Sequence, residues 1–186
     1  MEKNIMKWIT STMATLSVIG LIYLVGQMFT VSSFVFSWTL NFLLMAWFTF
    51  LASQIDFKLD SGYFESKKFE KEGKIYGYLG VHYYRRLLVW VGWEKITRQK
   101  NPVQKSISAL KLVEYNSRSS EFGHTIIALI VLILTLAVPN SLNDAKWLII
   151  TNILLNIYPI MLQRFNRPRL LKIIHHHIME EVLKND

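Results

Sequence analysis

Apolar residues gather into four blocks along this chain of 186 residues, and a short link joins the two blocks of each pair. The blocks run roughly over residues 8–29, 34–52, 121–138 and 145–162. A bilayer core about 30 Å thick needs about 20 apolar residues of helix, and about 17 are tolerated. The third block reaches that length only when Glu121 to Gly123 complete its first turn. The pattern predicts an all-α membrane protein with about four transmembrane helices.

The first block follows Lys3 and Lys7, as the apolar region of a signal peptide would. Its apolar run is longer than the roughly 7–15 residues of such a region, and another apolar block follows at once. We therefore expect a retained transmembrane helix. The length of the chain favours one domain, so we predict a single integral membrane domain over residues 1–186.

Basic residues indicate which loops face the cytoplasm. Residues 53–120 hold thirteen Lys or Arg against seven Asp or Glu, and the C-terminal segment 163–186 begins with three arginines and a lysine. The links between paired blocks are nearly uncharged. This alternation predicts that both termini and residues 53–120 are cytoplasmic. The net charge of +8 is then explained by topology, and we expect no nucleic-acid partner.

Two polar clusters, residues 118–124 and 163–169, lie at the cytoplasmic ends of the third and fourth predicted helices. A link of about six residues favours antiparallel packing of these two helices. We therefore expect the clusters to lie within about 15 Å of each other, which is the spacing of two helices plus side-chain reach. Together they predict one site at a membrane surface.

Glu121 and His124 are three residues apart, so on a helix they share a face. A carboxylate beside an imidazole can orient the ring and raise its basicity, as a general base requires. The alternative is that both side chains only reach toward lipid headgroups from a helix end. A di-iron bundle needs two Glu-x-x-His motifs and further Glu ligands, and this chain has one such motif. We predict Glu121 and His124 as catalytic residues.

The second cluster combines three arginines, Arg164, Arg167 and Arg169, with the amides of Gln163 and Asn166. Arginines after a membrane span are often plain positive-inside anchors. Such anchors do not need the two amides. Guanidinium and amide groups together can bind phosphate or carboxylate through paired hydrogen bonds. This cluster therefore predicts binding of a polar substrate group.

Pro168, within the C-terminal segment, predicts a helix break because the residue before proline disfavours helical geometry. The tract of residues 175–177 is three consecutive histidines, yet neighbours on a helix point about 100° apart. Pairing at i,i+4 with Glu180 and Glu181 accounts for them. We expect a solvated or interfacial tail and no metal site. The chain has no cysteine, which excludes disulfides and thiolate chemistry.

Residues 75–93 place aromatic side chains beside Arg85 and Arg86. This pattern fits a helix lying in the headgroup layer, and it fits equally a soluble amphipathic helix that packs on its neighbours. Asn101-Pro102 predicts a turn. Residues 104–117 predict a helix that leads toward the third span.

Several short motifs follow one another between Tyr63 and Leu170. They are Phe69-Glu70-Lys71-x-Gly73-Lys74-x-Tyr76, Arg118-x-x-Glu121-x-x-His124, Asn156-x-Tyr158-Pro159 and the run from Gln163 to Leu170. Their order resembles the glycosyl-4,4'-diaponeurosporenoate acyltransferase family of bacterial membrane proteins, which adds the fatty acyl ester of staphyloxanthin-type carotenoids. The resemblance covers over half of the chain.

The resemblance implies a multi-pass protein of the bacterial cell (inner) membrane that moves a fatty acyl group to a hydroxyl of a lipid or glycolipid acceptor. The co-substrate would be an acyl thioester such as acyl-CoA or acyl carrier protein, with no further cofactor. His124, oriented by Glu121, would take the hydroxyl proton, and the arginines would bind donor phosphates or the oxyanion. The substrate-binding residues on this interpretation are Arg118, Gln163, Arg164, Asn166, Arg167 and Arg169.

Two other functions fit parts of the sequence. A non-catalytic membrane partner could bind anionic lipid or a cytoplasmic enzyme through its basic segment. Another small membrane transferase, such as a methyltransferase, would use a different donor. The amides of the second cluster, together with Glu-x-x-His, favour the acyltransferase.

Overall fold

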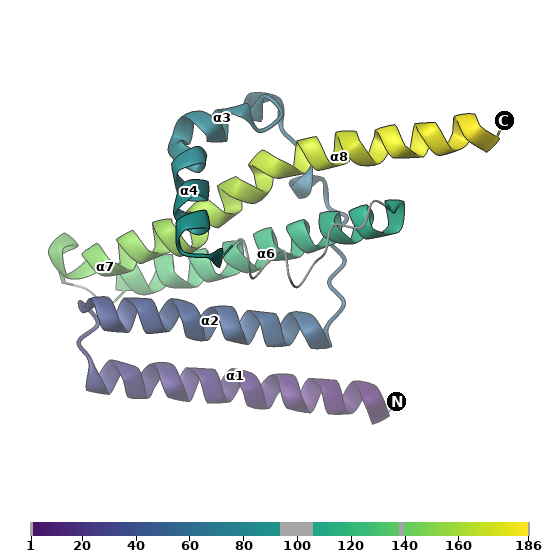
Figure 1. Cartoon of the computed structure of the whole chain (residues 1–186). Helices are drawn as coiled ribbons and strands as arrows, with labels where there is room; N and C mark the ends of the chain where they lie inside the picture. Colours follow the sequence, from purple (N-terminus) through teal and green to yellow (C-terminus); the bar gives the residue numbers. More distant parts are fainter. Residues whose placement is uncertain (1, 94–105, 138–139, 186) are drawn as a thin grey trace. The chain divides into compact units, whose positions relative to one another are not determined.

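All regular secondary structure is helical in residues 2–93, 106–137 and 140–185, which are the residues that this computed structural model describes (Figure 1). Four helical stretches are long and apolar enough to cross a membrane: Asn4–Met28, Phe34–Gln54, Ile107–Ala137 and Leu142–Leu183. The predicted all-α class with four such helices is confirmed.

The chain divides into two compact units. The first unit contains Met1–Lys58 and Phe122–Pro159, and the second unit contains Leu59–Glu121 and Ile160–Asp186. The boundary falls between Glu121 and Phe122, inside a helix that continues through both residues. Each unit is described separately below.

The first unit is built from apolar helices, and local sequence explains where the second of them begins. Ser33 caps the second helix by accepting a hydrogen bond from the Phe36 N–H, as serine does at helix starts. The first two helices lie side by side (Figure 1), and the Trp47 indole donates to the Thr15 hydroxyl at 3.0 Å. The helices are α1 (Glu2–Met28), α2 (Phe34–Gln54), α6 (Ile107–Ala137) from Phe122 onward, α7 (Leu142–Asn152) and the π-helical η4 (Ile153–Ile157).

The core of the first unit comes from three helices. A Cβ on Gly123 would lie 2.4 Å from the Phe48 ring, so α6 approaches α2 as closely as it does only because this residue is glycine. Deeper in the unit, the buried apolar side chains are Phe36, Leu40, Leu44 and Phe48 of α2, Ile127 and Val131 of α6, and Leu148 of α7.

The second unit combines several short helical turns with the first part of α6 and most of α8. Its core is small and consists of Tyr76, Val81 and Phe165. Its elements are η1 (Gly62–Phe64), η2 (Lys68–Glu70), α3 (Lys74–Tyr76), the π-helical η3 (Gly77–Val81), α4 (His82–Trp90), α6 up to Glu121, and α8 (Tyr158–Asn185) from Ile160.

Two helices extend beyond the predicted spans. The helix that contains residues 121–137 already begins at Ile107, because residues 107–120 contain no glycine or proline that would end it. The fourth predicted span continues as α8 to Asn185. The expected turn at Asn101–Pro102 lies outside the described residues.

The break predicted at Pro168 is wrong, because Pro168 lies inside α8. Proline cannot bond the carbonyl four residues back, which here belongs to Arg164. Gly73 approaches that carbonyl closely, since a Cβ on Gly73 would lie 2.8 Å from the oxygen. Gly73 also has φ +84°, which favours glycine. The ion pairs that Arg164 and Arg167 make in the turn just before Pro168 hold the helix where local sequence alone would end it.

Candidate functional site

In the second unit, the fully buried carboxylate of Glu121 lies between two arginines. The Arg164 Nε donates to Glu121 Oε1 at 2.7 Å, and the Arg167 Nη2 lies 2.5 Å from Oε2. The sequence led us to expect that residues 118–124 and 163–169 lie close together. The structure brings Glu121, Arg164 and Arg167 into direct contact.

Arg164 also binds a second buried carboxylate, that of Glu70. Its Nη1 lies 2.5 Å from Glu70 Oε1, and its Nη2 donates to the Tyr63 carbonyl at 2.9 Å. Glu70 further accepts from the Tyr76 hydroxyl at 2.7 Å and from the Lys67 N–H at 2.8 Å. Burial raises the pKa of Glu70, but these hydrogen bonds and the Arg164 charge outweigh burial, so the pKa lies below its usual value.

Arg167 is 3% exposed. Besides Glu121, it donates to the Phe64 carbonyl at 3.1 Å and to the Ser117 carbonyl at 3.2 Å. Two carboxylates and two guanidiniums thus neutralise one another, and we call Glu70, Glu121, Arg164 and Arg167 the charged cluster. The Arg164 Nε, Nη1 and Nη2 and the Arg167 Nη1 and Nη2 all contact groups within the protein, which leaves only the buried Arg167 Nε without a hydrogen-bond partner.

Arg118 and Arg169 make other contacts. The Arg118 Nε donates to Glu114 at 2.5 Å and its Nη1 donates to the Leu59 carbonyl at 2.8 Å. Arg169 is exposed at the helix surface, where its guanidinium lies 3.8 Å above the Phe165 ring. Of the arginines predicted to bind substrate, Arg169 is therefore the one that solvent reaches most easily.

Gln163 and Asn166 line a pocket in the second unit with a volume of about 310 Å³. Gln163 also donates to the Ser120 hydroxyl at 3.4 Å. One part of the lining is polar and the rest is apolar, so the pocket suits a ligand with both kinds of surface. Its lining residues are Arg85, Leu88, Val89, Trp93, Leu162, Gln163 and Asn166.

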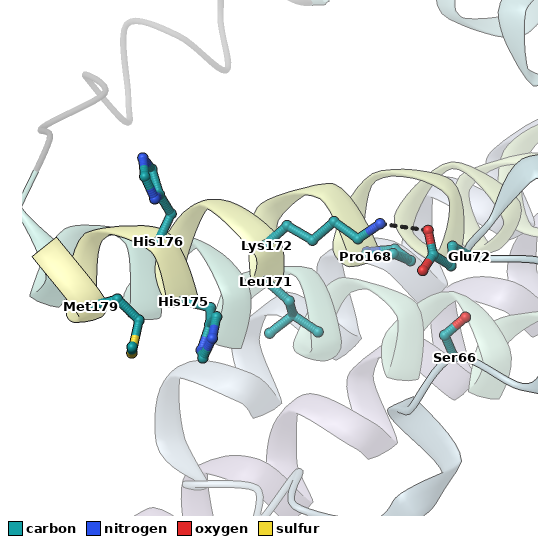
Figure 2. Close-up of a pocket in the computed structure, with 8 residues that line it drawn as sticks. All are labelled: Ser66, Glu72, Pro168, Leu171, Lys172, His175, His176 and Met179. Carbon is teal, nitrogen blue, oxygen red and sulfur yellow. Dashed lines mark hydrogen bonds and ion pairs between the residues drawn. The ribbon is translucent and has the colours of Figure 1, made fainter.

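A larger groove of about 600 Å³ lies along the C-terminal half of α8. Figure 2 shows the Lys172–Glu72 ion pair and the His175 ring along this groove. The two charged atoms of that pair are 2.5 Å apart. His176 pairs with Glu180 at 3.3 Å as predicted, whereas His177 pairs with Glu180 rather than Glu181, at 3.7 Å. The i,i+3 neighbour is as close on a helix as the i,i+4 neighbour. Among the described residues, no group of three or more His, Cys, Asp or Glu could hold a metal ion.

His124 belongs to the first unit, where its recorded partner is an amide. Its Nδ1 lies 3.3 Å from the Asn156 Oδ1. The Asn156 Nδ2 donates to the Asn41 Oδ1 at 2.7 Å and to the Asn152 Oδ1 at 3.0 Å. Asn41 and Asn156 are both fully buried. We call Asn41, Asn152 and Asn156 the amide cluster.

Sequence reasoning missed the amide cluster and Glu70 as parts of a site. The signal for the amides was present, because isolated polar residues inside apolar runs are costly unless they are paired. Glu70 was noticed only as part of a motif. Its pairing with Arg164 joins residues 94 positions apart, and a single sequence does not reveal such a contact.

No curated protein and no solved structure matches the chain. A family model described as glycosyl-4,4'-diaponeurosporenoate acyltransferase matches residues 60–176. That range is more than half of the chain and contains the charged cluster, His124 and Asn156. The chain therefore belongs to the glycosyl-4,4'-diaponeurosporenoate acyltransferase family, and it is an acyltransferase.

Proposed function

We propose that this protein is a membrane-embedded acyltransferase that moves a fatty acyl group from an acyl thioester to a hydroxyl of a lipid-linked acceptor at the cytoplasmic face. The observation that carries the proposal is His124, an imidazole beside the buried Asn156 amide on a helix otherwise apolar enough to cross a membrane. Family membership supports the reaction type. Ionisable residues within membrane spans are rare and costly, which supports a functional role for this histidine.

In the proposed reaction, His124 Nε2 accepts the proton of the acceptor hydroxyl while that oxygen attacks the thioester carbonyl carbon. A carbon–oxygen bond forms, the carbon–sulfur bond breaks, and the imidazolium returns the proton to the departing thiolate. The products are an ester and a free thiol. The acyl donor is the only co-substrate that this step requires.

For substrate binding, we propose the pocket that contains Gln163 and Asn166. Its amides and Arg85 would bind a polar head group, and its apolar wall would contact hydrocarbon. The exposed Arg169 would attract the phosphate of a donor such as acyl-CoA. Donor binding by Arg164 and Arg167 is not part of the proposal, since their N–H groups bind Glu70, Glu121 and backbone carbonyls.

The exposure of α4 supports a position in the headgroup layer. Tyr83 is 75% exposed and Trp90 is 84% exposed, and the helix buries none of its residues fully. A soluble helix that packed on its neighbours would bury such aromatic side chains. Aromatic residues beside Arg85 and Arg86 suit the membrane interface. A lipid acceptor would reach the enzyme from that layer.

Lipid profiling tests the reaction. Cells with the gene should contain a lipid that gains one acyl chain, and cells with His124→Ala should lose about 10²–10⁴-fold of that product, as general-base removal does. His175→Ala, which changes a histidine in the groove along α8, is the matched control and should keep full activity. Full product from His124→Ala at normal protein levels would reject the proposed base.

Labelling of introduced cysteines tests the cytoplasmic placement, because the natural chain contains no cysteine. Single cysteines at Ser33 and Ser141 should react with an impermeant reagent in intact cells, and one at Ser61 should react only after lysis. Reaction at Ser61 in intact cells would separate the second unit from cytoplasmic acyl donors and reject this part of the proposal.

A further inference from the structure

We infer that Asn156, itself oriented by Asn41, is a positioning residue that fixes His124 as the Nδ1–H tautomer and leaves Nε2 as its basic nitrogen. The geometric part of this inference stands on the first unit alone. Its meaning for the reaction rests on the proposed function of His124.

The orientation of the Asn156 amide is fixed by what its NH₂ group faces. Both recorded acceptors of Nδ2 are side-chain oxygens, Asn41 Oδ1 at 2.7 Å and Asn152 Oδ1 at 3.0 Å. An amide oxygen accepts and cannot donate. If the Asn156 amide were turned over, its oxygen would face two other oxygens. The NH₂ group therefore points away from His124, and Oδ1 points toward it.

The Asn41 amide is fixed in the same way. Its Nδ2 donates to the Ser37 carbonyl at 2.9 Å and to the Thr151 hydroxyl oxygen at 3.2 Å. The Thr151 hydroxyl is free to accept there because its own hydrogen goes to the Trp147 carbonyl at 2.8 Å. The direction of the whole chain of hydrogen bonds is thus set by backbone carbonyls of α2 and α7.

The Asn152 amide completes the arrangement. Its Nδ2 donates to the Ala128 carbonyl at 3.1 Å, which turns its oxygen toward Asn156. Asn41, Asn156 and Ser37 are fully buried, so water cannot replace a partner that a reversed amide would lose. One orientation of the cluster therefore satisfies every recorded contact.

For His124, this orientation determines which ring nitrogen carries the proton. Because the Asn156 Oδ1 only accepts, the nitrogen 3.3 Å away, Nδ1, must donate. A neutral imidazole that donates from Nδ1 has its lone pair on Nε2.

The π-helical turn at Ile153–Ile157 carries Asn156. Such turns are rare in proteins overall, and many of those that occur lie at functional sites. The competing explanation is that the amides only join helices to one another, as polar side chains do in membranes. The two explanations differ in what they predict for the His124 ring.

Nitrogen-15 spectra of histidine-labelled protein in lipid nanodiscs test the inference directly. His124→Gln identifies the His124 signals by their loss. We expect the neutral His124 ring to be protonated at Nδ1 in the natural protein and to lose this preference in Asn156→Ala. A ring protonated at Nε2 in the natural protein would overturn the inference without any variant, so it remains testable even if Asn156→Ala does not fold.

Enzyme kinetics give the second measurement. Asn156→Ala should lower kcat about 10–100-fold, the range seen when partners that orient metal-bound histidines are removed, with KM for the acceptor unchanged. Asn152→Ala is the matched control, because it removes one acceptor of Asn156 but leaves Asn41 to orient the amide, and it should keep the Nδ1–H tautomer. Equal tautomers in natural protein and folded Asn156→Ala would overturn the inference in favour of helix joining.

The two proposals fail in different ways. If Asn156→Ala changes the tautomer and His124→Ala keeps full activity, Asn156 does position the ring but His124 is not the base. If His124→Ala is inactive and Asn156→Ala leaves the tautomer and the kcat unchanged, His124 remains the base and the positioning role is rejected.

Discussion

The second unit buries full charges, whereas the first unit buries neutral amides. In the charged cluster, Glu121 and Glu70 face Arg164 and Arg167, and protein groups accept from both guanidiniums. In the amide cluster, the Asn156 Nδ2 donates to Asn41, and the Asn156 Oδ1 lies 3.3 Å from the Nδ1 of His124. The charged cluster thus holds ionised groups that pair with one another, whereas the amide cluster places neutral groups beside the residue that we propose as the base. The predictions below test that distinction.

The largest effect is expected from Glu121→Ala. Removing this carboxylate leaves buried Arg167 without its ion pair, and breaking a buried pair in this way typically costs about 3–5 kcal/mol of unfolding free energy. Thermal unfolding in detergent measures the loss. Glu180→Ala is the control, because Glu180 pairs with His176 on the exposed surface of α8. Equal stability of the two variants would show that the charged cluster does not hold the second unit.

Arg167→Lys should have a smaller effect of the same kind. Lysine keeps the positive charge but loses the planar fork that reaches both the Phe64 and Ser117 carbonyls. Leaving buried acceptors unpaired costs about 1–3 kcal/mol. We expect lower stability with an unchanged KM for the acyl donor. A raised KM at full stability would instead favour the donor-binding role that the sequence predicted for Arg167.

Acid should weaken the second unit through Glu70. The folded pKa of Glu70 lies below the reference value of 4.5, so its contribution to stability is fully present above about pH 4.5 and is lost as pH falls through the folded pKa. The amides of the first unit do not titrate in this range. Glu70→Gln should reduce the dependence of stability on pH below 4.5. If Glu70→Gln loses stability below pH 4.5 as steeply as the natural protein does, Glu70 is not the cause of that loss.

The smallest effect is expected from Lys172→Ala. The Lys172–Glu72 pair is as short as the buried pairs, at 2.5 Å, but its side chains are 66% and 60% exposed (Figure 2). Solvent-exposed ion pairs contribute little because water and salt screen them. We expect no measurable change in unfolding temperature. A clear loss would mean that distance rather than burial decides the strength of these pairs.

Much of the architecture could be read from local sequence. The apolar runs predicted four long helices because the length and hydrophobicity of a run do not depend on the rest of the fold. The order of motifs indicated the acyltransferase family. The spacing of the two polar clusters led us to expect that Glu121 lies near the arginines. Each of these inferences uses residues that are neighbours in sequence or repeat at a fixed period.

Tertiary structure decided the helix limits and the partners of the polar residues. Pro168 remains helical because contacts of Arg164 and Arg167 hold α8 around it. Asn156 meets Asn41 across 115 positions of sequence. No local pattern specifies such a pairing, since the approach of two helices depends on the packing of every side chain between them. The sequence determined which residues could carry the chemistry, and packing determined that Asn156 is the recorded side-chain partner of His124 while arginines hold Glu121.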